Sequence, residues 1–126
     1  MPRITVTTNI FLNKDQKKQL HEEFKAAIEI IPCEKGSFVM TDFSDDACVL
    51  FGDEGMDLPC ASIELAVIQD AFESCGKQVM EQVLFRMTES VMRNTKIPEE
   101  RIFAYYRNSP LWSYNRKNII GSLLKL

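Results

Sequence analysis

The residue whose position most invites a chemical role is Pro2, which follows the initiator methionine in the opening segment MPRITVTTNI. It has two interpretations. A proline is tolerated as the first residue of a strand for steric reasons alone. Alternatively, Pro2 is the working group of the protein. Taken by itself the position favours the strand interpretation, so the rest of the chain has to decide between them.

Few other side chains in the sequence could act as catalytic groups or metal ligands. The only histidine, His21, lies within KKQLHEEFK, on what reads as the solvent-facing side of a helix. The acidic runs at 44–46 and 52–57 read as turns and solvated loops. We expect no metal site, and no Ser-His or Cys-His hydrolase, because the base would be missing or misplaced. The cysteines are scattered, form no CxxC pair, and read as small buried hydrophobes: Cys33, Cys48, Cys60 and Cys75.

Length and composition are those of one ordinary folded domain. The chain has 126 residues, of which 45% are hydrophobic and 26% charged, and this argues against disorder. Its net charge of −3 offers no basic face for a nucleic acid. No apolar run approaches the ~18 residues that span a bilayer, and the N-terminus lacks the layout of a secretory signal. We therefore expect a cytoplasmic protein without nucleic-acid or membrane partners.

The first half of the chain reads as strand, helix and strand. PRITVTT alternates apolar and polar residues with the period of a half-buried strand. Asn13 and Gln16 form the pattern of a capping box in front of an amphipathic helix, which Pro32 is expected to stop. Residues 36–43 and 47–51 then read as two short strands.

The second half repeats this order. LPCASIELA has the layout of the first strand, a helix is expected over about 70–95, and ERIFAYYR reads as the strand after it. We predict a single domain over 1–126 with structural repeats at about 2–51 and 58–107. A helical crossover makes the two strands of each repeat parallel. The expected fold is α/β: a two-layer sandwich of duplicated β-α-β units, with one four-stranded mixed sheet and two helices on one face.

Such a sheet leaves one face without helices. We expect its apolar residues to need another layer, which favours an oligomer with these faces packed together. Aromatic residues also gather in the last quarter of the chain. Those on one side of the final strand fit the core, and those on the other side fit an interface or a pocket: Phe103, Tyr105, Tyr106, Trp112 and Tyr114.

The chain resembles the tautomerase superfamily, and within it the branch of macrophage migration inhibitory factor and its bacterial phenylpyruvate-tautomerase-like relatives. Four segments carry the resemblance, in this order: MPRITVTTNI, FGDEGMDLPCASIEL, IPEERIFAYY and WSYN. The match runs from Met1 to about Asn115, and RKNIIGSLLKL at 116–126 looks like an extension.

The resemblance implies a symmetric homotrimer, removal of Met1, and an N-terminal Pro2 that acts as a catalytic base. A free N-terminal proline is a secondary amine, and burial keeps its pKa low enough for general base catalysis near neutral pH. Such a base interconverts the keto and enol forms of an α-keto acid such as phenylpyruvate, without a metal or another cofactor. The implied activity is that of an isomerase.

The family's substrate-binding positions are only partly kept. The lysine that binds the substrate carboxylate in animal members falls on Glu34, so Lys35, Arg3 and Arg107 become the candidate cations. The pocket tyrosine of a neighbouring subunit falls on Phe103. A position that holds an asparagine in the family falls on Tyr105. Trp112 and Tyr114 match the aromatic rim of the family's pocket, and Ile68 matches a residue of its apolar wall. The family's CxxC is half present, as Cys60 followed by Ile63, and does not support thiol-redox activity.

Three functions compete. The first is the tautomerase just described, or a related hydratase or dehalogenase that would use Arg3 and Glu34 as well. The second is a non-catalytic trimeric interaction or signalling protein on the same scaffold, which the loss of the lysine and tyrosine favours. The third, a small-ligand sensor, rests on topology alone.

Overall fold

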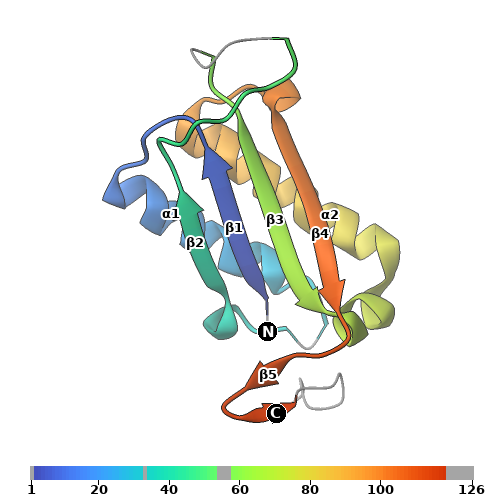
Figure 1. Cartoon of the computed structure of the whole chain (residues 1–126). Coiled ribbons are helices and arrows are strands. Elements are labelled where there is room, and N and C mark those ends of the chain that lie inside the picture. The colour runs from blue at the N-terminus through green and yellow to red at the C-terminus, as the bar shows by residue number, and fades with distance from the viewer. Residues whose placement is uncertain (1, 33, 54–57, 119–126) are drawn as a thin grey trace.

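Two strand-helix-strand units build one sheet with a helical layer behind it (Figure 1). The computed structural model describes residues 2–32, 34–53 and 58–118. The first unit consists of β1 (Arg3–Thr8), α1 (Lys14–Ile28) and β2 (Met40–Ser44), and the second of β3 (Ala61–Ile68), α2 (Gln69–Thr95) and β4 (Ile102–Ser109). Short 3₁₀ turns, η1 (Gly36–Phe38) and η2 (Glu99–Arg101), precede β2 and β4.

The strand order in the sheet is β2-β1-β3-β4. β1 is parallel to β2, β3 is parallel to β4, and the central pair β1 and β3 is antiparallel. This confirms the duplicated units and the mixed four-stranded sheet. Pro2, the start of β2 and the last residues of β3 and β4 lie at one end of the sheet, which we call the proline end. The opposite end is called the far end.

Helix α1 begins as the sequence predicts and ends earlier. The Asn13 side chain accepts from the Gln16 backbone N–H, and the Gln16 side chain accepts from the Asn13 backbone N–H, at 2.8 and 2.9 Å. This capping box satisfies two helix-end donors. The last helical residue is Ile28, so the chain leaves the helix before Pro32. Proline disfavours the helical conformation in the residue directly before it, here Ile31.

Helix α2 covers the expected range but is not continuous. Gly76 has φ 80° and ψ 173°, a non-helical conformation that breaks the helix after its second turn. At the other end, Lys96 adopts a left-handed conformation (φ 63°) and its N–H donates to the Met92 carbonyl, which is a common way to close a helix. Within the part of the chain that the structure describes, no helix is long and apolar enough to cross a membrane.

Two predicted strands are wrong in detail. Residues 36–38 form the 3₁₀ turn η1, so β2 starts only at Met40. Residues 47–51 join no regular strand and make one isolated bridge at Phe51. The backbone N–H groups of Asp46 and Ala47 donate to the carbonyls of Ile10 and Thr8. These bonds direct the segment towards the loop after β1, and not along the edge of β2.

The core lies between the sheet and the two helices. Alternate residues of the central strands point into it, and long side chains of both helices meet them; the largest fully buried ones include Ile4, Ile63, Leu65, Phe24, Ile28, Met80 and Met87. Burying a side chain of this size contributes about 1.5–3 kcal/mol relative to leaving it exposed. The burial of β1 and β3 therefore fixes the position of Pro2, which directly precedes β1.

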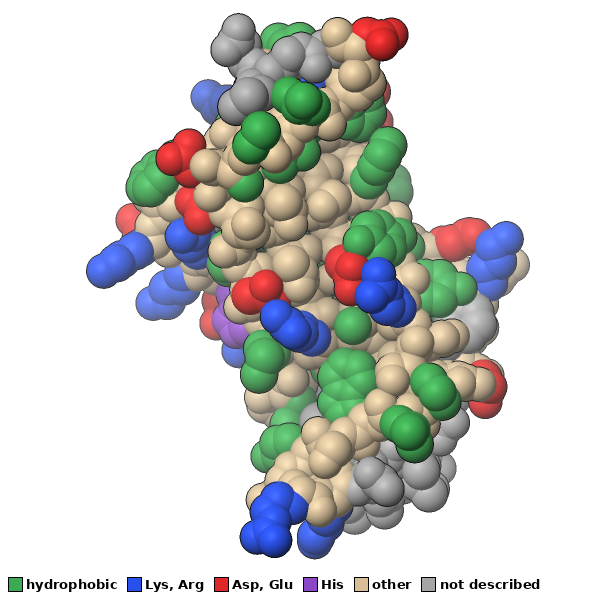
Figure 2. Space-filling view, in the orientation of Figure 1, with side chains coloured by type: hydrophobic (Ala, Val, Ile, Leu, Met, Phe, Trp, Pro, Cys, Tyr) green, Lys and Arg blue, Asp and Glu red, His purple; other side chains and the backbone are tan. Residues whose placement is uncertain are grey.

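The other side of the sheet, which we call the open face, carries mostly polar side chains. The strand registers arrange it in three rows, Met40–Arg3–Ala66–Arg107, Asp42–Thr5–Glu64–Tyr105 and Ser44–Thr7–Ser62–Phe103. Figure 2 shows neighbouring acidic and basic side chains near the middle of this face. The open face is more polar than expected, because the outward positions of β1 and β3 hold threonine, serine and charged residues besides Ala66. The expectation that these faces pack together in an oligomer stays a prediction.

After β4 the chain forms a small hairpin of β5 (Ser113–Tyr114) and β6 (Lys117–Asn118). Figure 1 shows it beyond the proline end of the sheet. Residues 116–118, which the sequence assigns to an extension, complete this hairpin. The remainder of that segment, 119–126, lies outside the described residues.

Candidate functional site

Pro2 is buried at the start of the central strand β1. Its carbonyl accepts the Met40 N–H at 3.1 Å. The next residue, Arg3, pairs with Ala66 on β3, so Pro2 lies beside the end of β3, where Ile68 is also buried. The fold thus holds the nitrogen of residue 2 at a fixed place near an apolar wall. The expected site residue Ile68 lies at this same end.

Aromatic side chains border the proline end. Phe38 and Tyr114 pack edge to face with ring centroids 5.6 Å apart, which joins η1 to the β5–β6 hairpin. Trp112 is half-buried and packs against the core. The hairpin therefore brings two of the predicted rim residues, Trp112 and Tyr114, to the end of the sheet where Pro2 lies.

In the segment between α1 and η1, Glu34 is buried and the next residue, Lys35, is exposed. Glu34 is only 6% exposed, and its Oε1 atom is inaccessible to solvent. Burial raises the pKa of the Cys75 thiol of α2, and the negative charge of Glu34 raises it further. Lys35 is exposed and directly precedes η1. The carboxylate is thus turned inward, and the lysine beside it reaches the surface.

Phe103 and Tyr105 do not reach Pro2 within one chain. Both lie on the open face of β4, and Arg107 occupies the row of Arg3. Phe103 is four residues before Arg107, which is about 13 Å along the strand, and two strand spacings of about 4.8 Å each separate β4 from β1. Within a single chain, Phe103 and Tyr105 are therefore too far from the proline end to share a pocket with Pro2.

Two of the candidate cations already face carboxylates. Arg3 Nε lies 3.1 Å from Asp42 Oδ1, and Arg107 lies 3.6 Å from Glu64 Oε2. Both arginine side chains are more than half exposed, so these pairs contribute little to stability. They nevertheless reduce the positive charge that either arginine offers to an anionic ligand.

Asp42 and Glu64 were missed by the reasoning from sequence. Glu64 accepts the Tyr105 hydroxyl at 2.6 Å, and Asp42 accepts the Thr5 hydroxyl at 2.9 Å. A signal was present, because Glu64 is an acidic residue in the middle of the apolar alternation ASIELA. Its partner is fixed by the strand register, which a single sequence does not reveal.

The far end is built around Phe103. Its ring packs on Phe51 with centroids 5.2 Å apart, and the Arg101 guanidinium lies 4.9 Å above the Phe51 ring. Arg101 is buried and also donates to the carbonyls of Pro59 and Leu58. These contacts fix the loop that carries Phe51 against the start of β4.

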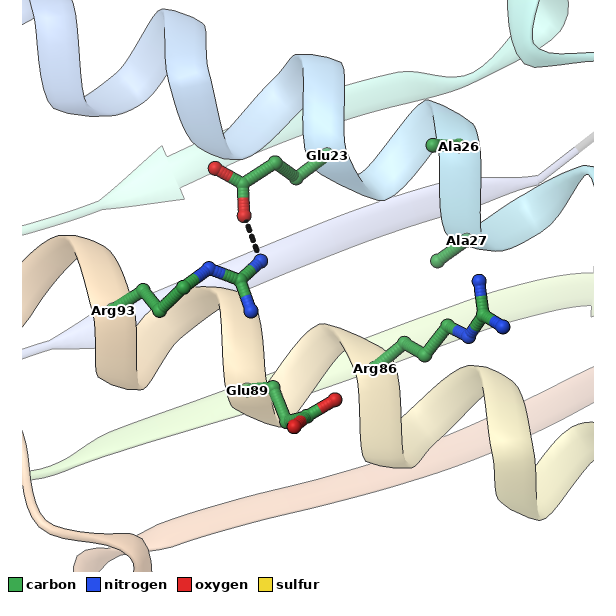
Figure 3. A pocket seen from close by; sticks show the side chains of 6 residues that line it. All are labelled: Glu23, Ala26, Ala27, Arg86, Glu89 and Arg93. Carbon is green, nitrogen blue, oxygen red and sulfur yellow. Dashed lines mark hydrogen bonds and ion pairs between the residues drawn. The ribbon is translucent and has the colours of Figure 1, made fainter.

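A groove lies away from this region, between α1 and α2 (Figure 3). Ala26 and Ala27 of α1 line it on one side, and Arg86, Glu89 and Arg93 of α2 on the other, with Glu23 paired to Arg93. A second groove runs along α2 beside the exposed Phe85. Both are on the helical side of the molecule, so neither contains a predicted site residue. Within the described residues, no group of three His, Cys, Asp or Glu side chains is placed to hold a metal ion.

These features define a class of protein: a two-layer α/β subunit of two β-α-β units, with a proline buried at the start of its central strand. Solved structures that match this fold include macrophage migration inhibitory factors. The MIF2 protein of Leishmania major matches with a TM-score of 0.78 and 20% identity over 94% of this chain and 97% of its own. The factor of Toxoplasma gondii gives 0.79 and 17%, over 93% and 99%.

A homologue from Prochlorococcus marinus matches with a TM-score of 0.77 and 19% identity, over 92% of this chain and 97% of its own. No protein-family model and no curated protein matches the sequence. The chain has the fold of macrophage migration inhibitory factor, and the resemblance seen in the sequence is confirmed at the level of the fold.

Proposed function

We propose that this chain is a cofactor-independent tautomerase that interconverts the keto and enol forms of an α-keto acid such as phenylpyruvate. Removal of Met1 makes Pro2 the N-terminal residue with a free secondary amine, and this amine is the general base. The observation that carries the proposal is the burial of Pro2 at the start of β1, in a fold shared with macrophage migration inhibitory factors. The whole chain, 1–126, acts as one domain in the cytoplasm.

The chemistry follows from the nitrogen of residue 2. A free α-amino group titrates at about 7.7–8.0, and an apolar surrounding lowers this value because it disfavours the charged form. The neutral secondary amine then takes a proton from the carbon beside the ketone and returns it to the oxygen or the carbon. The charge on the resulting ammonium is transient, so the site needs no permanent counter-ion for Pro2.

The substrate site requires a second copy of the chain. We propose a homotrimer in which the far end of one subunit meets the proline end of the next, so that Phe103 and Tyr105 complete the pocket of a neighbouring Pro2. Each end exposes large apolar side chains: at the proline end Phe38, Met40, Leu111 and Tyr114 (the proline-end patch), and at the far end Leu50, Leu58 and Phe103 (the far-end patch). Two different patches at opposite ends suit a head-to-tail ring.

Within this pocket the cation that holds the substrate carboxylate is Lys35 or Arg3. Lys35 is exposed beside the proline end, and Arg3 lies directly after Pro2, where it faces Asp42. Trp112 and Tyr114 contribute aromatic surface, and Ile68, buried within the subunit, is part of the apolar wall beside Pro2. A flat aromatic substrate fits such a lining, because aromatic groups bury a large area at a small entropy cost.

The alternative is a non-catalytic trimeric interaction protein. It is favoured by the buried Glu34 at the family's lysine position, by Phe103 in place of a tyrosine, and by the carboxylates beside Arg3 and Arg107. Each of these weakens the binding of an acidic substrate.

The test begins with the intact mass of the purified protein, which reports whether Met1 is absent. On that sample, phenylpyruvate tautomerisation is compared for wild type, Pro2→Gly and the control Glu89→Gln, which changes an exposed residue on the helical side of the molecule. We expect Pro2→Gly to be slower by about 10²-fold, the lower range for a lost general base, and Glu89→Gln to match wild type. Equal rates for Pro2→Gly and wild type exclude Pro2 as the base. A trimer without Met1 that shows no turnover favours the alternative.

A further inference from the structure

The β5–β6 hairpin ends in a tight turn that carries two adjacent cations. Tyr114 pairs with Lys117, so Asn115 and Arg116 alone form the loop, and both have positive φ angles, 52° and 65°. A two-residue turn with this backbone usually places glycine second. Here the second position is Arg116, for which a left-handed backbone is unfavourable. The hairpin therefore keeps a charged residue at its tip at some cost to local stability.

The positive charge at the tip is not neutralised by a neighbouring carboxylate. Arg116 and Lys117 are both exposed, and neither forms an ion pair with any residue that the structure describes. The arginines of the open face, by contrast, each face a carboxylate. Figure 2 shows basic side chains at the end of the molecule where the hairpin lies. The tip is thus a local positive charge on a chain whose net charge is −3.

The hairpin holds this charge beside the proline end. The contact between Phe38 and Tyr114 joins it to η1, which directly follows the exposed Lys35. Two exposed carboxylates at this end, Glu29 and Glu73, belong to the helical layer instead. The hairpin and the segment before η1 therefore place exposed cations on the border of the proline end.

Trp112 lies within the range of this charge. It is half-buried and directly precedes β5, two residues before Tyr114, which pairs with Lys117. Two residues of a strand span about 7 Å, and charges act over about 10 Å at an ionic strength of 0.1 M. A local positive potential raises the concentration of anions and the rate at which they arrive. Small anions should therefore gather around Trp112.

We propose that Arg116 and Lys117 form an electrostatic steering site for small organic anions, which draws them to the proline end without holding them in a fixed geometry. The inference goes beyond the proposed function, because it applies to any small anion, whether or not the chain converts it. In the proposed tautomerase the two cations would speed the capture of the α-keto acid, and this consequence alone rests on the proposed function.

The test uses Trp112 as a reporter, because it is the only tryptophan in the chain. Its fluorescence is quenched with anionic iodide, cationic caesium and neutral acrylamide, at a constant ionic strength of about 0.1 M. In Arg116→Gln/Lys117→Gln the ratio of the iodide to the caesium quenching constant should fall by about twofold, the effect of two charges roughly 10 Å away. The acrylamide constant should stay the same, which checks that the fold around Trp112 is intact.

Two further variants separate local charge from other effects. Lys14→Gln/Lys18→Gln makes the same change in net charge on exposed residues of α1 and should keep the wild-type ratio. Arg116→Lys/Lys117→Arg exchanges the two side chains but retains both charges, and it should also keep the ratio. At an ionic strength of about 1 M the Debye length is only about 3 Å, so the wild-type ratio should fall to that of Arg116→Gln/Lys117→Gln.

The inference is overturned if the wild-type ratio does not depend on ionic strength, or if Arg116→Gln/Lys117→Gln keeps it. It is equally overturned if the α1 control lowers the ratio as much as the hairpin variant does. Phenylpyruvate turnover on the same samples separates the two claims, since the hairpin variant should lower kcat/KM at low ionic strength and leave kcat unchanged. Charge-dependent quenching without turnover removes the proposed function alone. Turnover with unchanged quenching ratios removes the inference alone.

Discussion

Glu23 of α1 and Arg93 of α2 form an ion pair that joins the two helices on the side away from the open face. Glu23 also accepts from Ser90 and Asn94 of α2 and from Gln19 of its own helix. Partial burial by itself raises the pKa of a carboxyl group. Here the four hydrogen bonds outweigh burial and lower the pKa of Glu23 to about 2.

Acid should therefore weaken this helix pair. A carboxyl group whose pKa is lower in the folded than in the unfolded state stabilises the fold above its unfolded value, here 4.5. That stability is lost as the pH falls towards about 2. Since solvent reaches the groove, we expect Glu23→Gln to lower the free energy of unfolding at pH 7 by on the order of 1–2 kcal/mol.

Urea unfolding at pH 7, 4 and 3 measures this effect. The difference between wild type and Glu23→Gln should shrink as the pH falls. Glu89→Gln, an exposed residue of the same groove, is the control for the change in net charge. Parallel pH dependences for wild type and Glu23→Gln would contradict the role of the Glu23 cluster.

Gly76 gives a second prediction. Its backbone, at φ 80° and ψ 173°, lies in a region essentially reserved for glycine, and a Cβ added there meets no atom within 4 Å. Gly76→Ala is therefore expected to destabilise through the backbone alone, by about 1–3 kcal/mol. Gly52→Ala is the comparison, because Gly52 also has a positive φ (61°) and open space, but in an exposed turn.

Thermal unfolding of both glycine variants supplies the measurement. Gly76→Ala should lower the midpoint clearly. An unchanged or raised midpoint would mean that α2 runs straight through residue 76, since alanine is favoured over glycine in a helix interior.

Helix α1 provides a local test of the sequence signal that defined it. Asn13→Ala removes the acceptor for the Gln16 N–H, and the expected loss is about 1 kcal/mol. Lys14→Ala changes an exposed neighbour that makes no part of the capping box and should stay within about 0.5 kcal/mol of wild type. Equal free energies of unfolding for Asn13→Ala and the wild type would show that the capping box does not stabilise the protein. Chemical denaturation of the three proteins decides the matter.

The features that the sequence predicted correctly are those set by local patterns. The Asn13 cap, the period of α1 and α2, and the parallel pairs within each unit depend on residues close in sequence or on the length of a crossover. The errors arise where contacts with backbone that is distant in sequence determine the local structure. Hydrogen bonds to Thr8 and Ile10 redirect the segment after Asp46, and a single glycine in a helical pattern gave no sign of the break at Gly76.

The same division applies to the candidate site. Pro2, Ile68 and the aromatic residues were recognised by type and by a family resemblance. Glu64 was not, because its importance comes from lying opposite Tyr105 on the neighbouring strand. The polarity of the open face was missed for a related reason. An alternating sequence shows that a strand has an apolar and a polar face. Only the full strand register shows which outward residues of the four strands become neighbours.

The proposed head-to-tail trimer makes the last prediction. Leu111 in the proline-end patch is 77% exposed and Phe103 in the far-end patch 62%. If the two patches meet between subunits, Leu111→Ser or Phe103→Ser alone should shift a wild-type trimer to monomer in light scattering. Phe85→Ser, which removes an equally exposed aromatic residue from the helical side, should remain a trimer.

A mixture of the two variants sharpens this test. The Leu111→Ser chain keeps its far-end patch and the Phe103→Ser chain keeps its proline-end patch, so together they can form one wild-type interface. A head-to-tail contact therefore predicts a heterodimer in the mixture and monomers in each variant alone. A two-fold contact, in which each patch meets its own copy, predicts that each single variant retains one intact interface and still dimerises. A monomeric wild type would exclude both arrangements, together with any pocket shared between Pro2 and the Phe103 of a neighbour.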